Sequence, residues 1–238
     1  MNTTKLIEKK LFLHCKTSKD TTMTDKCYLL SGLGADGSVF QYIDFEGVEV
    51  EYIEWIAPLP KETLSAYAQR ISQKITTSHP ILVGLSFGGM VAMEIAKQIP
   101  VKKLILISSA KGRKELPWFY RFSARLNIQK ILPYTLMKRA NAFTYWLFGV
   151  TSPQEKALLK NILRNTPTIF LKWAINTILT WKNTEIPTHI LHIHGDKDLI
   201  LPYRNVKNTH CIIGGGHSMI INRAHEITPV INKFLNNY

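Results

Sequence analysis

Short apolar runs alternate with longer amphipathic stretches along most of this chain. The runs are rich in Ile, Leu and Val and are bounded by Gly, Pro or polar residues, which is typical of strands buried in a parallel sheet. Apolar positions three or four residues apart in the stretches between them indicate helices. We predict strands near residues 11–15, 26–30, 48–54, 80–85, 103–108, 188–193 and 209–213, and helices near 61–77, 88–98 and 224–235. This alternation predicts an α/β fold, a mostly parallel sheet flanked by helices.

Two segments depart from the general pattern. Residues 48–54 alternate polar and apolar positions, which indicates one solvated face and a place towards a sheet edge. Residues 111–184 lie between two predicted strands and have the pattern of several amphipathic helices instead. We therefore expect a single domain with a core formed by residues 1–110 and 185–238, into which 111–184 is inserted as a helical cap.

A serine lies at the junction of a predicted strand and a predicted helix. The sequence Gly84-Leu85-Ser86-Phe87-Gly88 follows the apolar run 81–83 and has the pattern Gly-x-Ser-x-Gly. A nucleophilic serine in this position needs a sharp turn, and glycines on both sides let the strand and helix backbones approach. The pattern predicts that Ser86 is a nucleophile, with an ordinary glycine-rich loop as the alternative.

A nucleophilic serine needs a base and a group that orients the base. His217 follows three glycines after the last predicted strand, so it lies on a loop at a strand end. The loop 194–202, after the preceding predicted strand, carries two carboxylates, Asp196 and Asp198. The chain order serine, acid, histidine matches that of one known class of serine enzymes.

With these three motifs in this order, the chain from about residue 27 to its end resembles the α/β-hydrolases. The resemblance implies that Ser86 attacks an acyl carbon, that His217 takes and returns the proton, and that Asp198 holds the histidine tautomer and stabilises the imidazolium. The family's spacing from His194 favours Asp198 over Asp196. The family also places an acid after an earlier strand, but residues 109–113 contain no carboxylate.

The resemblance also implies an oxyanion hole of two backbone amides. Phe87, directly after the serine, supplies one candidate, and Leu33, in the loop after the strand 26–30, supplies the other. Family members often begin this loop with His-Gly, whereas this chain has Ser31-Gly32, which keeps the backbone donor. We expect Asp36 to cap a helix that begins near Gly37.

Composition agrees with one self-sufficient domain. The chain has 238 residues, 45% of them hydrophobic, which is enough for a core without disulfides or metals. Its three cysteines, Cys15, Cys27 and Cys211, are scattered and indicate buried thiols in a reducing compartment. Residues 1–10 contain no long apolar run, so we expect neither a signal peptide nor a membrane span. We therefore expect a cytoplasmic location.

The predicted cap has an unusual composition. Residues 111–184 hold thirteen Lys or Arg against two acids, Glu115 and Glu155, in a chain of net charge +13, together with half of its aromatic residues. An apolar lining with a cationic exterior suits an acyl chain carried on an anionic group or on an acidic protein. Docking on an anionic membrane surface is a reading that we favour less. The alternative stays open that the aromatic residues only pack the cap onto the core and that the charges only keep the cap soluble.

Other ligands are disfavoured. His192 and His194 alternate along one strand, but no further ligand follows at metal-site spacing, so we expect no metal. The Gly-x-Gly at 32–34 and the glycines 214–216 lack the rest of a phosphate or dinucleotide motif, and we expect no cofactor. The basic residues accompany no nucleic-acid motif, so no nucleic-acid partner is expected.

These observations favour a serine hydrolase of the carboxylesterase or thioesterase kind, acting on a small acyl ester or thioester. Two alternatives stay open. The same residues could abstract a proton for an elimination or a carbon–carbon cleavage, or the chain could bind a ligand without turnover.

Overall fold

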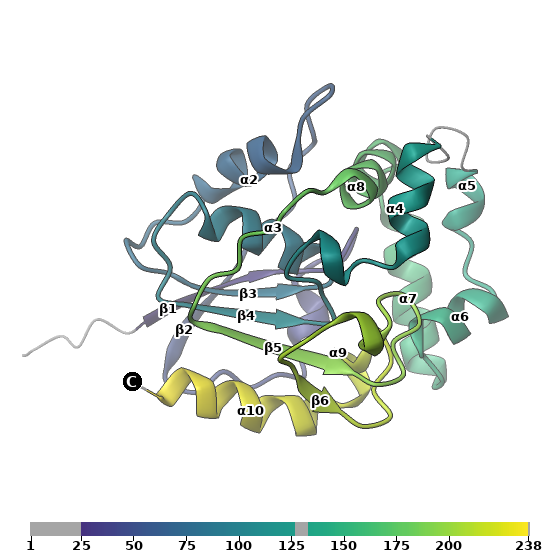
Figure 1. Ribbon diagram of the computed structural model, residues 1–238. Helices are drawn as coiled ribbons and strands as arrows, with labels where there is room; N and C mark the ends of the chain where they lie inside the picture. Colours follow the sequence, from purple (N-terminus) through teal and green to yellow (C-terminus); the bar gives the residue numbers. More distant parts are fainter. Residues whose placement is uncertain (1–24, 127–132, 238) are drawn as a thin grey trace, which may run out of the picture.

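In the computed structural model, which describes residues 25–126 and 133–237, six strands form one parallel sheet in the order β2-β1-β3-β4-β5-β6 (Figure 1). The α/β fold class is confirmed. The strands are β1 (Asp25–Leu30), β2 (Val48–Tyr52), β3 (Ile81–Leu85), β4 (Lys103–Ile107), β5 (Ile190–Gly195) and β6 (His210–Ile212). Each matches a predicted strand, and the remaining prediction, at 11–15, lies outside the described residues.

Helices cover both faces of the sheet. One face carries α2 (Leu64–Ser72) and α3 (Phe87–Ala96), and the other carries the short helix η1 (Gly37–Phe40), α9 (Met219–Asn222) and α10 (Ala224–Asn236). The helices predicted at 88–98 and 224–235 are confirmed, and Asp36 caps η1 by accepting a hydrogen bond from the Ser38 amide at 3.0 Å.

The helix predicted at 61–77 is shorter at both ends. It begins at Leu64 because the Thr63 side chain accepts a hydrogen bond from the Ala66 amide and caps the helix there. It ends at Ser72, after which the Ile75 amide bonds three residues back to Ser72 in a tight turn.

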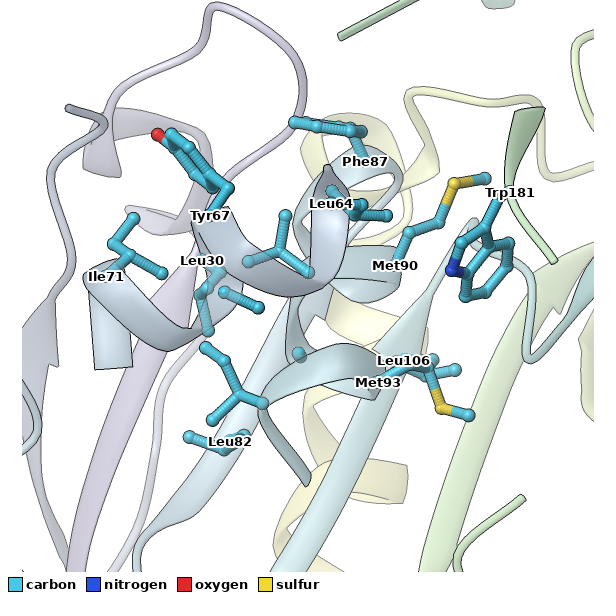
Figure 2. Close-up of a cluster of buried hydrophobic side chains, with 14 of the residues drawn as sticks. Leu30, Leu64, Tyr67, Ile71, Leu82, Phe87, Met90, Met93, Leu106 and Trp181 are labelled. Carbon is cyan, nitrogen blue, oxygen red and sulfur yellow. The ribbon is translucent and has the colours of Figure 1, made fainter. Parts of the chain in front are cut away.

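Two apolar clusters lie above and below the sheet because successive strand residues point to opposite faces. Tyr28 and Leu30 of β1 belong to the cluster under α2 and α3, whereas Cys27 and Leu29 belong to the cluster with α10. Figure 2 shows the first cluster, in which Leu30, Leu82 and Leu106 from three strands meet Leu64, Tyr67 and Ile71 of α2 and Met90 and Met93 of α3. The predicted edge strand is confirmed, since β2 ends the sheet with Glu49 and Tyr52 exposed.

Residues 111–184, which we call the inserted segment, connect β4 to β5. They form η2 (Arg113–Glu115), α4 (Trp118–Arg125), α5 (Tyr134–Met137), α6 (Ala142–Phe148), α7 (Pro153–Asn165) and α8 (Thr168–Thr180), with α8 packed on α4 and α5. The helices α4 to α8 lie beyond the carboxyl ends of the strands (Figure 1). The short helix η4 (Tyr203–Asn205) follows β5. Across the described ranges, we find no helix with both the length and the apolar character to cross a membrane.

Candidate active site

Ser86 occupies the turn between β3 and α3 in a strained backbone conformation. Its φ is 51° and its ψ is −117°, a region that costs a residue with a side chain of the order of 1–3 kcal/mol. The turn is tight because a Cβ on Gly84 would overlap the backbone of Gly89, and one on Gly88 would overlap the Leu30 carbonyl. The two glycines of the motif therefore permit the approach of strand and helix that aims the serine side chain away from the sheet.

The three residues predicted as serine, base and acid lie together in one hydrogen-bonded chain. Ser86 Oγ lies 2.8 Å from His217 Nε2, and His217 Nδ1 lies 2.8 Å from Asp198 Oδ2. Because an ionised carboxylate only accepts, Nδ1 carries the proton and Nε2 is free to accept one from the serine. Asp198 and His217 are both buried, whereas Ser86 is partly exposed.

Asp198 is held as a carboxylate by several donors. Its second oxygen, Oδ1, accepts hydrogen bonds from the backbone amides of Ile200 and Leu201, each at 2.8 Å. Burial acts to raise the pKa of this carboxyl, but its electrostatic interaction and hydrogen bond with His217, together with His194 and the Leu201 amide, outweigh the effect of burial. The pKa of Asp198 is therefore lowered, and this residue is ionised at neutral pH.

Asp196 points elsewhere. Its Oδ1 accepts a hydrogen bond from the Gly214 amide at 2.6 Å, and no contact joins it to His217 within the described residues. Beside it, the Lys197 amide donates to the Gly215 carbonyl at 2.9 Å. Asp196 thus links the loop after β5 to the loop that carries His217, and the geometry favours Asp198 as the acid.

The two residues predicted to supply the oxyanion-hole amides, Leu33 and Phe87, lie in the same cavity as Ser86. A Cβ on Gly32 would lie 3.8 Å from the Ser86 Cβ. The Gly32 carbonyl accepts hydrogen bonds from the Ala35 amide at 3.0 Å and from Trp55 Nε1 at 3.3 Å. Because C=O and N–H point in opposite directions in a trans peptide, these two bonds also fix the direction of the Leu33 N–H.

A cavity of about 700 Å³ opens at Ser86 and His217. Its walls are mostly apolar, and within the described ranges no Asp, Glu, Lys or Arg lines it. The inserted segment supplies much of the wall, including Phe119, Leu147, Leu163, Leu171, Ile175 and Ile178. The volume suits a small organic ligand, and the lining suits an uncharged apolar group.

Two buried histidines, His192 and His194, contact the surroundings of Ser86 and Asp198. The sequence pattern did not predict these contacts. His192 Nε2 lies 3.0 Å from the Ser109 carbonyl, and the Ser109 hydroxyl donates to the Ser86 carbonyl at 2.7 Å. His194 Nε2 donates to the Leu201 carbonyl at 2.7 Å and lies 3.4 Å from Asp198 Oδ2.

Both histidines are neutral. Burial, followed by the neighbouring His194 and Lys111, lowers the pKa of His192 to about 3, and burial is also the largest cause of the lowered pKa of His194. In each ring, Nε2 faces a carbonyl oxygen that only accepts, so Nε2 carries the hydrogen. Of the residues that the structure describes, no three His, Cys, Asp or Glu are grouped to hold a metal ion.

The inserted segment also contacts the predicted base. The Phe148 ring lies 5.7 Å from the His217 ring at 77°, and the Phe148 carbonyl accepts a hydrogen bond from the Ser218 amide at 3.0 Å. The sequence offered no sign of this contact, because it depends on where α6 ends relative to the loop after β6.

Comparison with known proteins agrees with the α/β fold. The model of the alpha/beta hydrolase family matches residues 21–229, and the chain belongs to that family. A poly(3-hydroxyalkanoate) depolymerase from Ectopseudomonas oleovorans is 24% identical over an alignment of 245 positions, covering 87% of this chain and 83% of the relative.

Solved structures share the fold at low identity. A putative lipase from Acinetobacter baumannii AYE has a TM-score of 0.66 at 15% identity, covering 92% of this chain and 87% of its own. An enol-lactonase from Burkholderia xenovorans LB400 has a TM-score of 0.65 at 17% identity, covering 90% and 92%. An esterase from Exiguobacterium antarcticum has a TM-score of 0.63 at 17% identity, also covering 90% and 92%.

Proposed function

We propose that the protein is a serine hydrolase that cleaves a carboxylic ester or thioester through an acyl-enzyme on Ser86. The observation that carries the proposal is the chain of hydrogen bonds from Ser86 through His217 to Asp198 at the wall of an apolar cavity. Such a chain supplies a nucleophile, a base and a group that orients the base. The relatives named depolymerase, lipase, esterase and enol-lactonase support ester hydrolysis as the reaction.

The proposed reaction has two halves. In the first, His217 Nε2 takes the proton of Ser86 as the serine oxygen bonds to the acyl carbon, and the carbonyl electrons move to the oxygen, which the Leu33 and Phe87 amides stabilise. Collapse of this intermediate breaks the bond to the alcohol or thiol, which leaves with the proton from His217. In the second half, water gives a proton to His217, attacks the acyl-enzyme and releases the acid, and Ser86 regains its proton. Asp198 stays ionised throughout.

In this proposal the inserted segment acts as a cap that decides which acyl groups enter. Its helices form much of the apolar wall, and Phe148 packs against the base. The cavity favours a neutral acyl chain over a charged one, because burying a charge away from water without a partner is costly.

Covalent labelling tests the proposal. A fluorophosphonate should label Ser86 on the folded protein, and the Ser86→Ala variant should lose both the label and the release of p-nitrophenol from acyl esters. The matched control is Ser123→Ala, since Ser123 also lines the cavity but its hydroxyl donates to the Phe119 carbonyl at 2.7 Å. This variant should keep the label.

Three outcomes would point elsewhere. Labelling at another residue would remove Ser86 from the mechanism. Stoichiometric binding of an ester without product would favour a binding protein, and turnover only of substrates with an acidic C–H would favour an elimination or carbon–carbon cleavage. Parallel assays of matched esters and thioesters decide which bond is cleaved faster.

A further inference from the structure

The inserted segment exposes aromatic side chains on two helices. Trp118, Phe119 and Phe122 are exposed on α4, and Phe143 and Trp146 on α6, with Trp118 at 66%, Phe143 at 64% and Trp146 at 61% relative exposure. We call these five residues the aromatic face. Single exposed apolar residues are ordinary on protein surfaces, but exposed aromatic residues grouped on neighbouring turns mark an interaction site.

The aromatic face borders the opening of the cavity. Phe119 and Phe143 both line the cavity and are exposed, so they lie at its edge. Each is in ring contact with an exposed tryptophan, Phe119 with Trp118 at 6.1 Å and Phe143 with Trp146 at 5.7 Å. Apolar surface thus continues from the outside of the inserted segment into the cavity that contains Ser86.

Cations lie among these aromatic residues without balancing acids. Arg121 and Arg125 belong to α4, and Lys138 and Arg139 lie between α5 and α6. Within the described ranges, no carboxylate is in ion-pair distance of these four side chains.

The two acids of the inserted segment contact other groups. Glu115 is buried against Lys111, and Glu155 accepts a hydrogen bond from the Thr151 amide at 2.8 Å. The charged side chains of α4 and of the connection between α5 and α6, next to the aromatic face in the sequence, are therefore all cations.

We propose that the aromatic face docks on an anionic lipid surface and presents the cavity opening to it. Aromatic side chains are favoured at the boundary between headgroups and acyl chains, because one part of the ring is apolar and the Trp N–H can remain hydrated. Arg and Lys beside them attract anionic headgroups. Trp118 and Phe122 are four residues apart on α4, as are Arg121 and Arg125, so each pair shares one side of the helix.

A lipid surface accounts for the observations better than a protein partner does. The cations could bind an acidic protein, but a purely charged surface has no counterpart for five exposed aromatic rings, two of which lie at the edge of an apolar cavity. A second copy of this chain would bring the same cations together, which disfavours self-association through this face. An acyl chain of a lipid could pass from the lipid layer into the cavity without crossing water.

Vesicle binding tests the proposal, using the Ser86→Ala protein so that the result is independent of catalysis. It should cosediment with vesicles of equimolar phosphatidylcholine and phosphatidylglycerol and much less with phosphatidylcholine alone. The Arg121→Gln/Arg125→Gln variant should bind the anionic vesicles roughly 30-fold more weakly. The matched control, Lys61→Gln/Lys233→Gln, removes two exposed charges outside the inserted segment and should bind as the parent protein does.

Tryptophan fluorescence locates the contact. Vesicles should shift the emission to shorter wavelength, and the Trp118→Phe/Trp146→Phe variant should keep binding while losing most of the shift. Trp118→Ser/Trp146→Ser should lose binding, whereas Ile213→Ser, at a 77% exposed position outside the inserted segment, should not.

Four results would overturn the proposal. They are absence of vesicle binding, equal binding to neutral and anionic vesicles, equal loss in the control variants, and a dimer in solution that Trp118→Ser/Trp146→Ser dissociates. Failure of the hydrolase proposal, by contrast, would leave vesicle binding intact.

Discussion

His194 Nε2 lies 3.4 Å from Asp198 Oδ2, the same oxygen that accepts the hydrogen bond of His217. The His194 ring is buried and neutral, and its hydrogen points to the Leu201 carbonyl at 2.7 Å. The Leu201 amide in turn donates to Asp198 Oδ1. His194 thus holds the carbonyl of Leu201, the residue whose amide bonds to Asp198, and we regard His194 as a positioning residue.

We expect His194→Phe to destabilise the protein by about 1–3 kcal/mol, because it leaves the buried Leu201 carbonyl without its donor. His194→Gln can retain a donor and should cost less. Urea unfolding measures both values. If the histidine positions Asp198, then kcat should fall in the Phe variant with little change in KM and recover in part in the Gln variant; a purely structural role would leave kcat per folded molecule unchanged.

The two carboxylates of the loop after β5 should differ sharply on substitution. Asp198→Asn should lower kcat by roughly three to four orders of magnitude, because the amide favours the wrong His217 tautomer. Asp196→Asn should cost far less, since Asp196 bonds to the Gly214 amide and not to His217. Steady-state kinetics on one ester decide between them. The reverse ranking would move the acid to Asp196, and two small effects would argue against the proposed mechanism.

His192 makes stability depend on pH in a defined direction. Its pKa falls from 6.5 to about 3 in the folded protein, so below about pH 6.5 the unfolded chain binds a proton that the folded chain does not. The free energy of unfolding should therefore fall as pH is lowered from about 6.5 towards 3, by about 1.4 kcal/mol per pH unit for this group.

The variant His192→Gln should flatten this dependence, because the amide keeps a donor for the Ser109 carbonyl and does not titrate. Urea unfolding at pH 7 and about pH 5 gives the difference for each protein. His79→Gln, at an exposed position, is the matched control and should leave the slope unchanged. An equal slope in the His192→Gln and parent proteins would contradict the assignment of a neutral buried ring.

The sequence was sufficient to predict those features that depend on residues consecutive in the chain. Ser86 could be placed because a strand, a turn with flanking glycines and a helix are consecutive in the chain. The loops of Asp198 and His217 followed from strand ends, and the sheet followed from apolar runs of strand length. The boundaries of α2 were less accurate, because the Thr63 cap competes with a helical pattern that continues on both sides.

Contacts between distant segments could not be predicted. Ser109 was noted only for the lack of a carboxylate nearby, yet its hydroxyl holds the Ser86 carbonyl across 23 residues of sequence. Phe148 meets His217 only because α6 ends beside the loop after β6. The direction of Asp196 was likewise undetermined, since it depends on the Gly214 amide of another loop.

The size and lining of the cavity predict the preferred acyl chain. The cavity holds about 700 Å³ with no charged wall residue among those described, so each added methylene should be buried against apolar side chains. Burial of one methylene contributes about 0.8 kcal/mol, which corresponds to a rise in kcat/KM of roughly fourfold per methylene until the cavity is filled. A series of p-nitrophenyl esters, from acetate upwards, measures this rise.

A bulkier side chain in the cavity wall should then shift the preferred length. Ile175 of α8 lines the cavity, and Ile175→Trp should move the optimum to shorter chains while leaving turnover of the acetate ester nearly unchanged. Ile169→Trp is the matched control on the same helix, because Ile169 is 75% exposed and does not line this cavity. A flat dependence on chain length in the parent protein, or the same shift in both variants, would mean that the acyl group binds outside this cavity.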